Sequence, residues 1–196
     1  MKLTGVILAG GKAQRMNGAN KALVSFHGKP MIAEVIKRLQ PQVDEILINA
    51  TSANEFSAFQ LPTIMDEIGD FSGPLAGLHT GLHHAKNDWI LCVPCDSPLL
   101  PYNLAEKLVL AIEENKAEIA VAKTRDEVNG EKIHAVFCLC KKSLLPDLEH
   151  YLKNGGRKVN EWQKQHRYVE VNFDDQVQAF ANINTFEELA QLEAST

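Results

Sequence analysis

Apolar and polar positions along the chain follow two periods, one typical of strands and the other of helices. Residues Leu3–Leu8 form a short, near-continuous apolar run that ends at two glycines, the pattern of a strand buried on both faces. Between Pro30 and Pro41, apolar residues recur three and four positions apart, which predicts an amphipathic helix bounded by two prolines.

The same alternation continues to the end of the chain. Further strands are expected at 45–49, 62–65, 89–93, 119–122 and 134–140, and further helices at 73–85, 104–112 and 144–152. Thr185 and Glu188 have the spacing of a capping box, which predicts a final helix. This order is typical of a three-layer α/β/α sandwich with a mainly parallel, Rossmann-like sheet. Because no linker-like stretch divides residues 1–196, a single domain is expected.

Composition and charge exclude several classes of protein. The chain has 196 residues, 45% of them hydrophobic, and a formal net charge of −5. Its Lys and Arg residues are scattered apart from one group near the N-terminus, which argues against a nucleic-acid partner and leaves room for small anionic ligands. No apolar run approaches the roughly 20 residues that span a bilayer. The short apolar start is interpreted as a strand, not a signal peptide, so we expect a cytoplasmic protein away from the membrane.

The four cysteines lie in apolar, strand-like segments, where a reduced thiol behaves as a small hydrophobe. They are Cys92, Cys95, Cys138 and Cys140. Their spacing also permits a zinc site or redox chemistry in principle. The intervening Pro94 and the strand context argue against both.

Chemistry is expected in the loops that follow the strands, since open α/β sheets bind ligands there. The loop after the first strand contains glycines that let the backbone approach a ligand, and cations that suit a triphosphate. Its residues of interest are Leu8, Ala9, Gly10, Gly11, Lys12, Arg15 and Lys21. It matches neither the Walker A nor the dinucleotide fingerprint. The alternative is a flexible loop with solvated basic residues.

Three other strand ends carry polar side chains. Asp96 stands between two prolines after the strand at 89–93, and one carboxylate suffices for Mg²⁺ when substrate phosphates and water complete its coordination. Alternatively, Asp96 caps the turn or the following helix. Asn49 and Asp66 end two strands on one side of the expected sheet, where their oxygens could accept from guanine N–H groups or a ribose hydroxyl. Asn49 could also be a simple turn residue.

The C-terminal half offers a second polar region. Arg157 and Lys158 follow two glycines in a compact basic loop that could hold the phosphate of a second substrate. Asn182 and Asn184 precede the capped final helix. For Asn184 the alternative is the ordinary polarity of a segment before a helix.

Several spaced motifs together resemble one known family. They are LAGGKAQRM at 8–16, Lys21, GPLAG at 73–77, PCDSP at 94–98 and NINTFEEL at 182–189. In this order, along essentially the whole chain, they resemble the small GT-A-like nucleotidyltransferases and, within these, the MobA family of molybdenum cofactor guanylyltransferases. One departure is Asn20 before Lys21, where relatives usually have an acidic residue.

The resemblance implies transfer of GMP from GTP to the phosphate of Mo-molybdopterin, with Mg²⁺ held by Asp96. It implies catalytic roles for Arg15, Lys21 and Asp96. It places GTP in the N-terminal half, against Leu8, Ala9, Gly10, Gly11, Lys21, Asn49, Asp66, Gly77 and Asp96. It places the acceptor in the C-terminal half, against Arg157, Lys158, Asn182 and Asn184, with Asn182 as an alternative metal ligand. Other molybdenum cofactor biosynthesis proteins and acceptor molybdoenzymes are possible partners.

Two other functions stay open from the sequence. One is a related nucleotidyltransferase that uses CTP or another phosphorylated acceptor, such as a methylerythritol phosphate or a phospholactate. The other is a catalytically silent GTP-binding or cofactor-delivery protein, against which the intact Arg15, Lys21 and Asp96 argue. His79 and His83 lie four positions apart on an expected helix, but Thr80 stands where a zincin has glutamate, so they are expected to be ordinary surface or core histidines.

Overall fold

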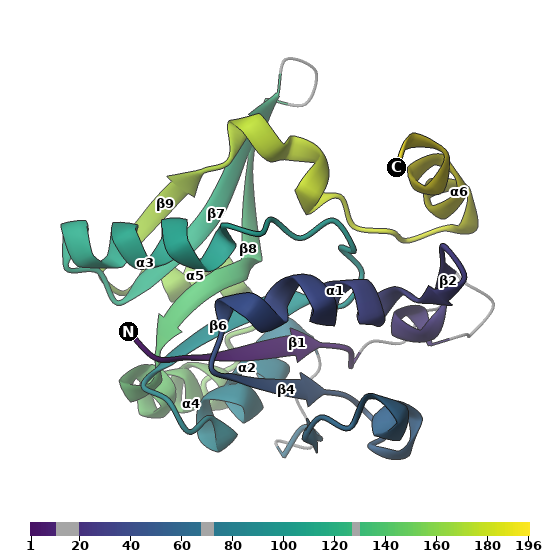
Figure 1. Cartoon of the computed structure of the whole chain (residues 1–196). Coiled ribbons are helices and arrows are strands. Elements are labelled where there is room, and N and C mark those ends of the chain that lie inside the picture. The colour runs from purple at the N-terminus through teal and green to yellow at the C-terminus, as the bar shows by residue number, and fades with distance from the viewer. Residues whose placement is uncertain (11–19, 68–72, 127–129) are drawn as a thin grey trace.

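A single mixed sheet organises the computed structural model, which describes residues 1–10, 20–67, 73–126 and 130–196 (Figure 1). In the described part of the chain the sheet has seven strands in the order β5-β4-β1-β6-β8-β7-β9. They are β1 Leu3–Leu8, β4 Glu45–Asn49, β5 Thr63–Ile64, β6 Trp89–Pro94, β7 Ile119–Asp126, β8 Gly130–Lys141 and β9 Tyr168–Asn172. All of these run parallel except β8, which is antiparallel to both β6 and β7. The predicted mainly parallel sheet is therefore confirmed.

Helices cover both faces of this sheet, and the C-terminal helix lies to one side of it (Figure 1). They are α1 Met31–Leu39, α2 Pro74–His84, α3 Leu104–Asn115, α4 Leu145–Lys153, α5 Val159–Gln163 and α6 Phe186–Ser195. Short 3₁₀ turns at Lys21–Leu23, Gln40–Gln42, Asn54–Phe59, Lys142–Leu144 and Asp174–Phe180 join the main elements, and β2 Ser25–Phe26 pairs with β3 Lys29–Pro30 in a separate hairpin. Among the described residues, no helix combines the length and the apolar character needed to cross a membrane.

Two hydrophobic cores lie on opposite faces of the sheet, because successive strand residues point to opposite sides. On one face, Ile7 of β1 packs in the same cluster as residues of α1 and α3. On the other, its neighbour Val6 packs with residues of α2, α4 and α5, including the fully buried Trp162. Trp162 satisfies its indole N–H by donating to Asp147 at 3.0 Å. The four cysteines are free and buried in these strand regions, as expected for small hydrophobes.

Helix α2 packs unusually close to β1 because glycines face the strand. A Cβ atom added at Gly81 would lie 2.8 Å from a methyl group of Val6, and one added at Gly77 would lie 2.7 Å from Leu8. The two glycines are four positions apart and share a helix face. Gly73, before the helix, has a φ of 105°, in the left-handed region that favours glycine. The GPLAG motif therefore brings the start of α2 against the end of β1.

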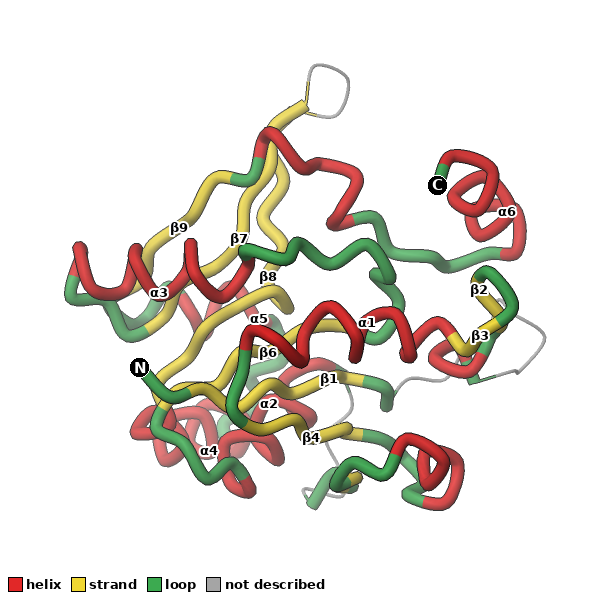
Figure 2. The backbone as a smooth tube through the Cα atoms, viewed as in Figure 1, coloured by secondary structure: helices red, strands yellow, loops and turns green. Residues whose placement is uncertain are grey.

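The C-terminal helix α6 packs against the β2–β3 hairpin (Figure 2). A third small cluster joins them, made of Phe26, Met31, Ile183, Leu189 and Leu192. Thr185 and Glu188 form the predicted capping box at the start of α6. Glu193 accepts a 2.6 Å hydrogen bond from the His27 backbone. The segment before α6 is thereby held between the hairpin and the end of β6.

A candidate nucleotidyl-transfer site at the strand ends

The ends of β1, β4 and β6 lie side by side at one edge of the sheet. Leu8 is in register with Asn49 on one side and with Pro94 on the other. The backbone continues this pairing beyond the strands, since Ala9 N–H donates to the Asn49 carbonyl at 2.7 Å and Cys95 N–H donates to the Leu8 carbonyl at 3.1 Å. Ala9 and Cys95, the first residues after β1 and β6, are therefore held beside the neighbouring strands.

Lys21, Asp96 and Asn184 meet at this edge although they come from three distant parts of the chain. The Lys21 ammonium donates to Asp96 Oδ2 at 2.5 Å and to Asn184 Oδ1 at 2.8 Å. The side chains of Lys21 and Asp96 are only 18% and 15% exposed. Partial burial strengthens a charge pair compared with a surface one, because solvent screens it less. The predicted catalytic lysine and aspartate are thus brought together.

Asp96 keeps one carboxylate oxygen available for a cation. Its Oδ1 is buried and has no hydrogen-bond partner among the described residues. A buried charged oxygen without a partner is costly, and a bound divalent cation would satisfy it. Burial raises the pKa of the neighbouring Cys95 thiol to about 12, and sulfur is a poor ligand for a hard cation such as Mg²⁺, which prefers oxygen.

The segment before α6 is fastened to the loop that carries Asp96. Ile183 N–H donates to the Asp96 carbonyl at 2.9 Å, and Ser97 Oγ donates to Asn182 Oδ1 at 2.9 Å. Glu188 accepts from the backbone N–H of Asn184 at 2.5 Å. Ser97 and Glu188 were not among the predicted site residues, although both lie in the recognised motifs. Their role is to hold the two asparagines in place.

A second group of predicted residues converges around Asn49. Its side chain is buried, and its Nδ2 donates to Asp66 Oδ1 at 2.8 Å. This bond turns the amide oxygen toward α2, where a Cβ atom at Gly77 would come within 2.4 Å of it. A Cβ atom added at Gly10 would lie 3.5 Å from the same oxygen. The amide oxygen and the exposed Asp66 carboxylate together offer acceptors beside the β1 end.

Asn20 shows how the chain accommodates its departure from the family pattern. The Asn20 side chain accepts from Ala22 N–H at 3.2 Å and donates its Nδ2 to Glu55. An aspartate could still accept from Ala22, but it could not donate, and it would face the Glu55 carboxylate as a like charge. The amide therefore suits this position next to Glu55 and still caps the turn that carries Lys21.

Arg157 and Lys158 lie apart from this cluster, in the loop after α4. Arg157 Nη1 donates to the carbonyls of Leu152 and Gly156, at 3.1 and 2.6 Å. Lys158 Nζ lies 2.7 Å from Glu161, which raises the lysine pKa above its ordinary value. Both residues are exposed. Gly11, Lys12 and Arg15, predicted for the phosphate loop, lie outside the described residues.

This combination of fold and site is that of a nucleotidyltransferase. A mainly parallel sheet presents a lysine, a carboxylate with an unpartnered oxygen and a pair of hydrogen-bonded acceptor side chains at one edge. The model of the MobA-like NTP transferase domain matches residues 5–169. The chain belongs to this family.

Similar proteins agree with this assignment. The chain is 44% identical to a molybdenum cofactor guanylyltransferase of Cupriavidus pinatubonensis, over 98% of this chain and 96% of the relative. Its fold is similar to that of the molybdopterin-guanine dinucleotide biosynthesis protein A of Archaeoglobus fulgidus, with a TM-score of 0.80 and 22% identity over 98% and 97% of the two chains. It is also similar to that of 4-diphosphocytidyl-2C-methyl-D-erythritol synthase of Anaerococcus prevotii, with a TM-score of 0.79 and 12% identity over 99% and 97%.

Proposed function

We propose that this protein transfers GMP from GTP to the terminal phosphate of Mo-molybdopterin and releases pyrophosphate. The observation that carries the proposal is the meeting of Lys21, Asp96 and Asn184 at the strand ends. The relative from Cupriavidus pinatubonensis, whose name states this activity, supports the choice of GTP and of a molybdenum cofactor acceptor. One domain performs both tasks, with GTP in its N-terminal half and the acceptor in its C-terminal half.

In the proposed reaction an oxygen of the acceptor phosphate attacks the α-phosphorus of GTP. The bond from this phosphorus to the oxygen bridging the α- and β-phosphates breaks, and its electron pair leaves with pyrophosphate. Because the attacking oxygen already carries negative charge, no strong general base is needed. Alignment and charge neutralisation then supply the rate. Lys21 and Arg15 neutralise the leaving phosphates, while Asn184 orients the Lys21 ammonium.

Asp96 is the proposed ligand for Mg²⁺. Its buried, unpartnered Oδ1 is a hard oxygen donor, which fits a cation that takes few protein ligands and completes its coordination with phosphate oxygens and water. When bound, Mg²⁺ would neutralise charge that develops on the phosphates. Asn182 is an alternative second ligand, although its amide oxygen accepts from Ser97.

The acceptors around Asn49 are proposed to select guanine. Guanine presents N–H donors at N1 and N2, which match the oxygens of Asn49 and Asp66. Leu8, Ala9, Gly10, Gly11 and Gly77 would frame the base. We infer that the reaction takes place in the cytoplasm, where four free cysteines stay reduced. Other cofactor biosynthesis proteins and acceptor molybdoenzymes are the proposed partners.

GTP should support turnover roughly 100 times better than CTP. A site that hydrogen-bonds its base leaves its own polar groups unpaired when the wrong base enters. The measurement is pyrophosphate release with each nucleoside triphosphate, Mg²⁺ and Mo-molybdopterin. Equal rates with CTP would favour the related cytidylyl-transferring function, and absence of pyrophosphate with every nucleotide would favour a silent binding protein.

The two basic regions, one with Lys21 and one with Arg157, are expected to bind different substrates. Lys21→Ala should weaken GTP binding by roughly 10- to 150-fold, the cost of one charge-assisted hydrogen bond. Arg157→Ala should instead raise the apparent KM for Mo-molybdopterin by a similar factor, because its loop is assigned to the acceptor phosphate. Calorimetry with GTP alone and steady-state kinetics with both substrates separate the two effects. If Arg157→Ala weakened GTP binding as much as Lys21→Ala, both loops would serve the triphosphate.

A further inference from the structure

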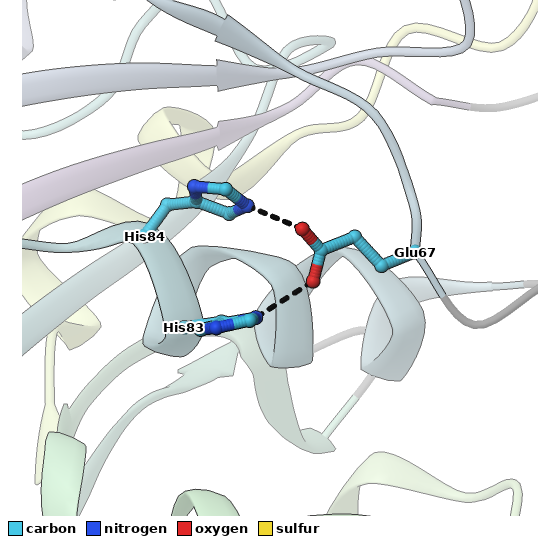
Figure 3. Close-up of side chains that lie close together, drawn as sticks. All are labelled: Glu67, His83 and His84. Atoms are coloured by element: carbon cyan, nitrogen blue, oxygen red, sulfur yellow. Dashed lines mark hydrogen bonds and ion pairs between the residues drawn. The ribbon is translucent and has the colours of Figure 1, made fainter.

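Glu67, His83 and His84 form a compact cluster on the surface of α2 (Figure 3). Within the described residues, their ligand atoms all lie within 4.8 Å of one another. Glu67 Oε2 lies 2.6 Å from His83 Nδ1, and Glu67 Oε1 lies 2.7 Å from His84 Nε2. Adjacent helix residues do not normally face each other. Here each imidazole contacts a different oxygen of the Glu67 carboxylate, so both rings lie beside the same group.

The surroundings of the cluster favour a cation. His83 and His84 are the last two residues of α2, where the helix dipole places partial negative charge. The Glu67 carboxylate, which contacts both imidazole rings, adds a negative charge at the same place. The three side chains are 57%, 40% and 41% exposed for His83, His84 and Glu67. An ion from solvent can therefore reach them without any opening of the fold.

We propose that Glu67, His83 and His84 bind a Zn²⁺ ion. Imidazole nitrogens together with a carboxylate oxygen are ligands that zinc prefers, and three protein ligands plus water complete a tetrahedral site. In such a site, with bonds of about 2.0–2.1 Å, neighbouring ligand atoms are about 3.3 Å apart. The two carboxylate–imidazole separations, 2.6 and 2.7 Å, are shorter than this value, and every pair of ligand atoms lies within 4.8 Å. Small rotations of exposed side chains are enough to replace the two hydrogen bonds by metal bonds.

This site differs in chemistry and in place from the one at Asp96. Mg²⁺ prefers oxygen ligands and keeps much of its water, so two imidazoles do not attract it. The zinc cluster is nevertheless connected through the chain to the residues proposed to bind the base, because Asp66, which accepts from Asn49, directly precedes Glu67. Bound Zn²⁺ fastens this segment to the end of α2, whose beginning supplies Gly77.

The test is zinc binding to the full chain, first freed of metal with a chelator and then held in millimolar Mg²⁺. Calorimetry should find one Zn²⁺ bound per chain, and zinc should raise the unfolding temperature of the wild-type protein. His83→Ala, His84→Ala and Glu67→Gln should each weaken binding by at least roughly 10- to 100-fold, the loss that follows removal of even an outer-shell partner of a metal ligand. His150→Ala is the matched control, since His150 is exposed and hydrogen-bonds to Asn154, away from the cluster.

Asp96→Asn is the second control, because it alters the proposed magnesium ligand and leaves the cluster intact. Both controls should bind zinc as the wild type does. The proposal is overturned if the His83 and His84 variants bind zinc as tightly as the wild type. It is equally overturned if Asp96→Asn abolishes zinc binding, which would locate the ion at the nucleotide site. Unfolding temperatures of the metal-free variants show that each is folded before it is titrated.

Discussion

Asp96→Asn is expected to lower turnover by roughly 1,000-fold, comparable to the loss of a group that stabilises transition-state charge. The change keeps the size of the side chain and its capacity to hydrogen-bond, but it removes the negative charge that the proposed Mg²⁺ needs. The fold should persist, because Lys21 retains its 2.8 Å hydrogen bond to Asn184 and Ile183 still binds the backbone carbonyl of residue 96. Pyrophosphate release at saturating GTP, acceptor and Mg²⁺ measures the effect.

Asp175→Asn is the matched control for this variant. Asp175 is a largely exposed carboxylate that lies 3.7 Å from Lys107, outside the proposed site. It should leave turnover unchanged, and both variants should unfold at nearly the wild-type temperature. If Asp96→Asn retained wild-type turnover at saturating Mg²⁺, Asp96 would not be the metal ligand.

Gly77→Ala is expected to weaken GTP binding by roughly 100- to 1,000-fold. The new methyl group would lie 2.4 Å from Asn49 Oδ1, which is far closer than real carbon and oxygen atoms approach. Asn49 is buried and bound to Asp66, so it cannot move aside without losing that contact. Loss of the base contacts of these two residues would cost about 3–4 kcal/mol. Calorimetric titration with GTP in the absence of acceptor tests this expectation.

Gly81→Ala is the control for Gly77→Ala. It tests whether crowding between α2 and β1 alone, without a clash at Asn49, weakens GTP binding. Its methyl group would press on Val6 in the hydrophobic core, one helical turn away from Asn49. It should lower the unfolding temperature and leave GTP affinity within about twofold of wild type. A folded Gly77→Ala protein that binds GTP as well as Gly81→Ala would show that the base lies elsewhere.

The elements that could be predicted are those whose burial is decided locally. The strand Leu3–Leu8 could be predicted because burial on both faces makes it a continuous apolar run, and the helix after Pro30 because it buries one face with a helical period. The strand Tyr168–Asn172 was not predicted, because it lies at the sheet edge and is only half-buried, so its pattern is weak. The reversed direction of β8 is likewise invisible in hydrophobicity, which fixes burial but not strand polarity.

The contacts of the candidate site likewise divide into those that could be predicted from the sequence and those that could not. Asn49 and Asp66 could be placed together because parallel strands end at one edge, and the structure joins them by a hydrogen bond. The contact between Lys21 and Asn184 could not be derived from strand order, since it depends on α6 packing against the β2–β3 hairpin. Likewise, no spacing rule brings Glu67 to His83, because a loop, not a repeating element, carries it there.

The two ends of the Lys21–Asn184 hydrogen bond are made at very different times during synthesis of the chain. Lys21 and Asn184 are 163 positions apart, so a ribosome adding about 5–20 residues per second makes them roughly 8 to 33 seconds apart. A nascent chain can pair β1, β4 and β6 early, but until the C-terminal segment follows, Lys21 lacks the amide that orients it. Products that end before Asn184 lack this amide, and we expect them to be inactive.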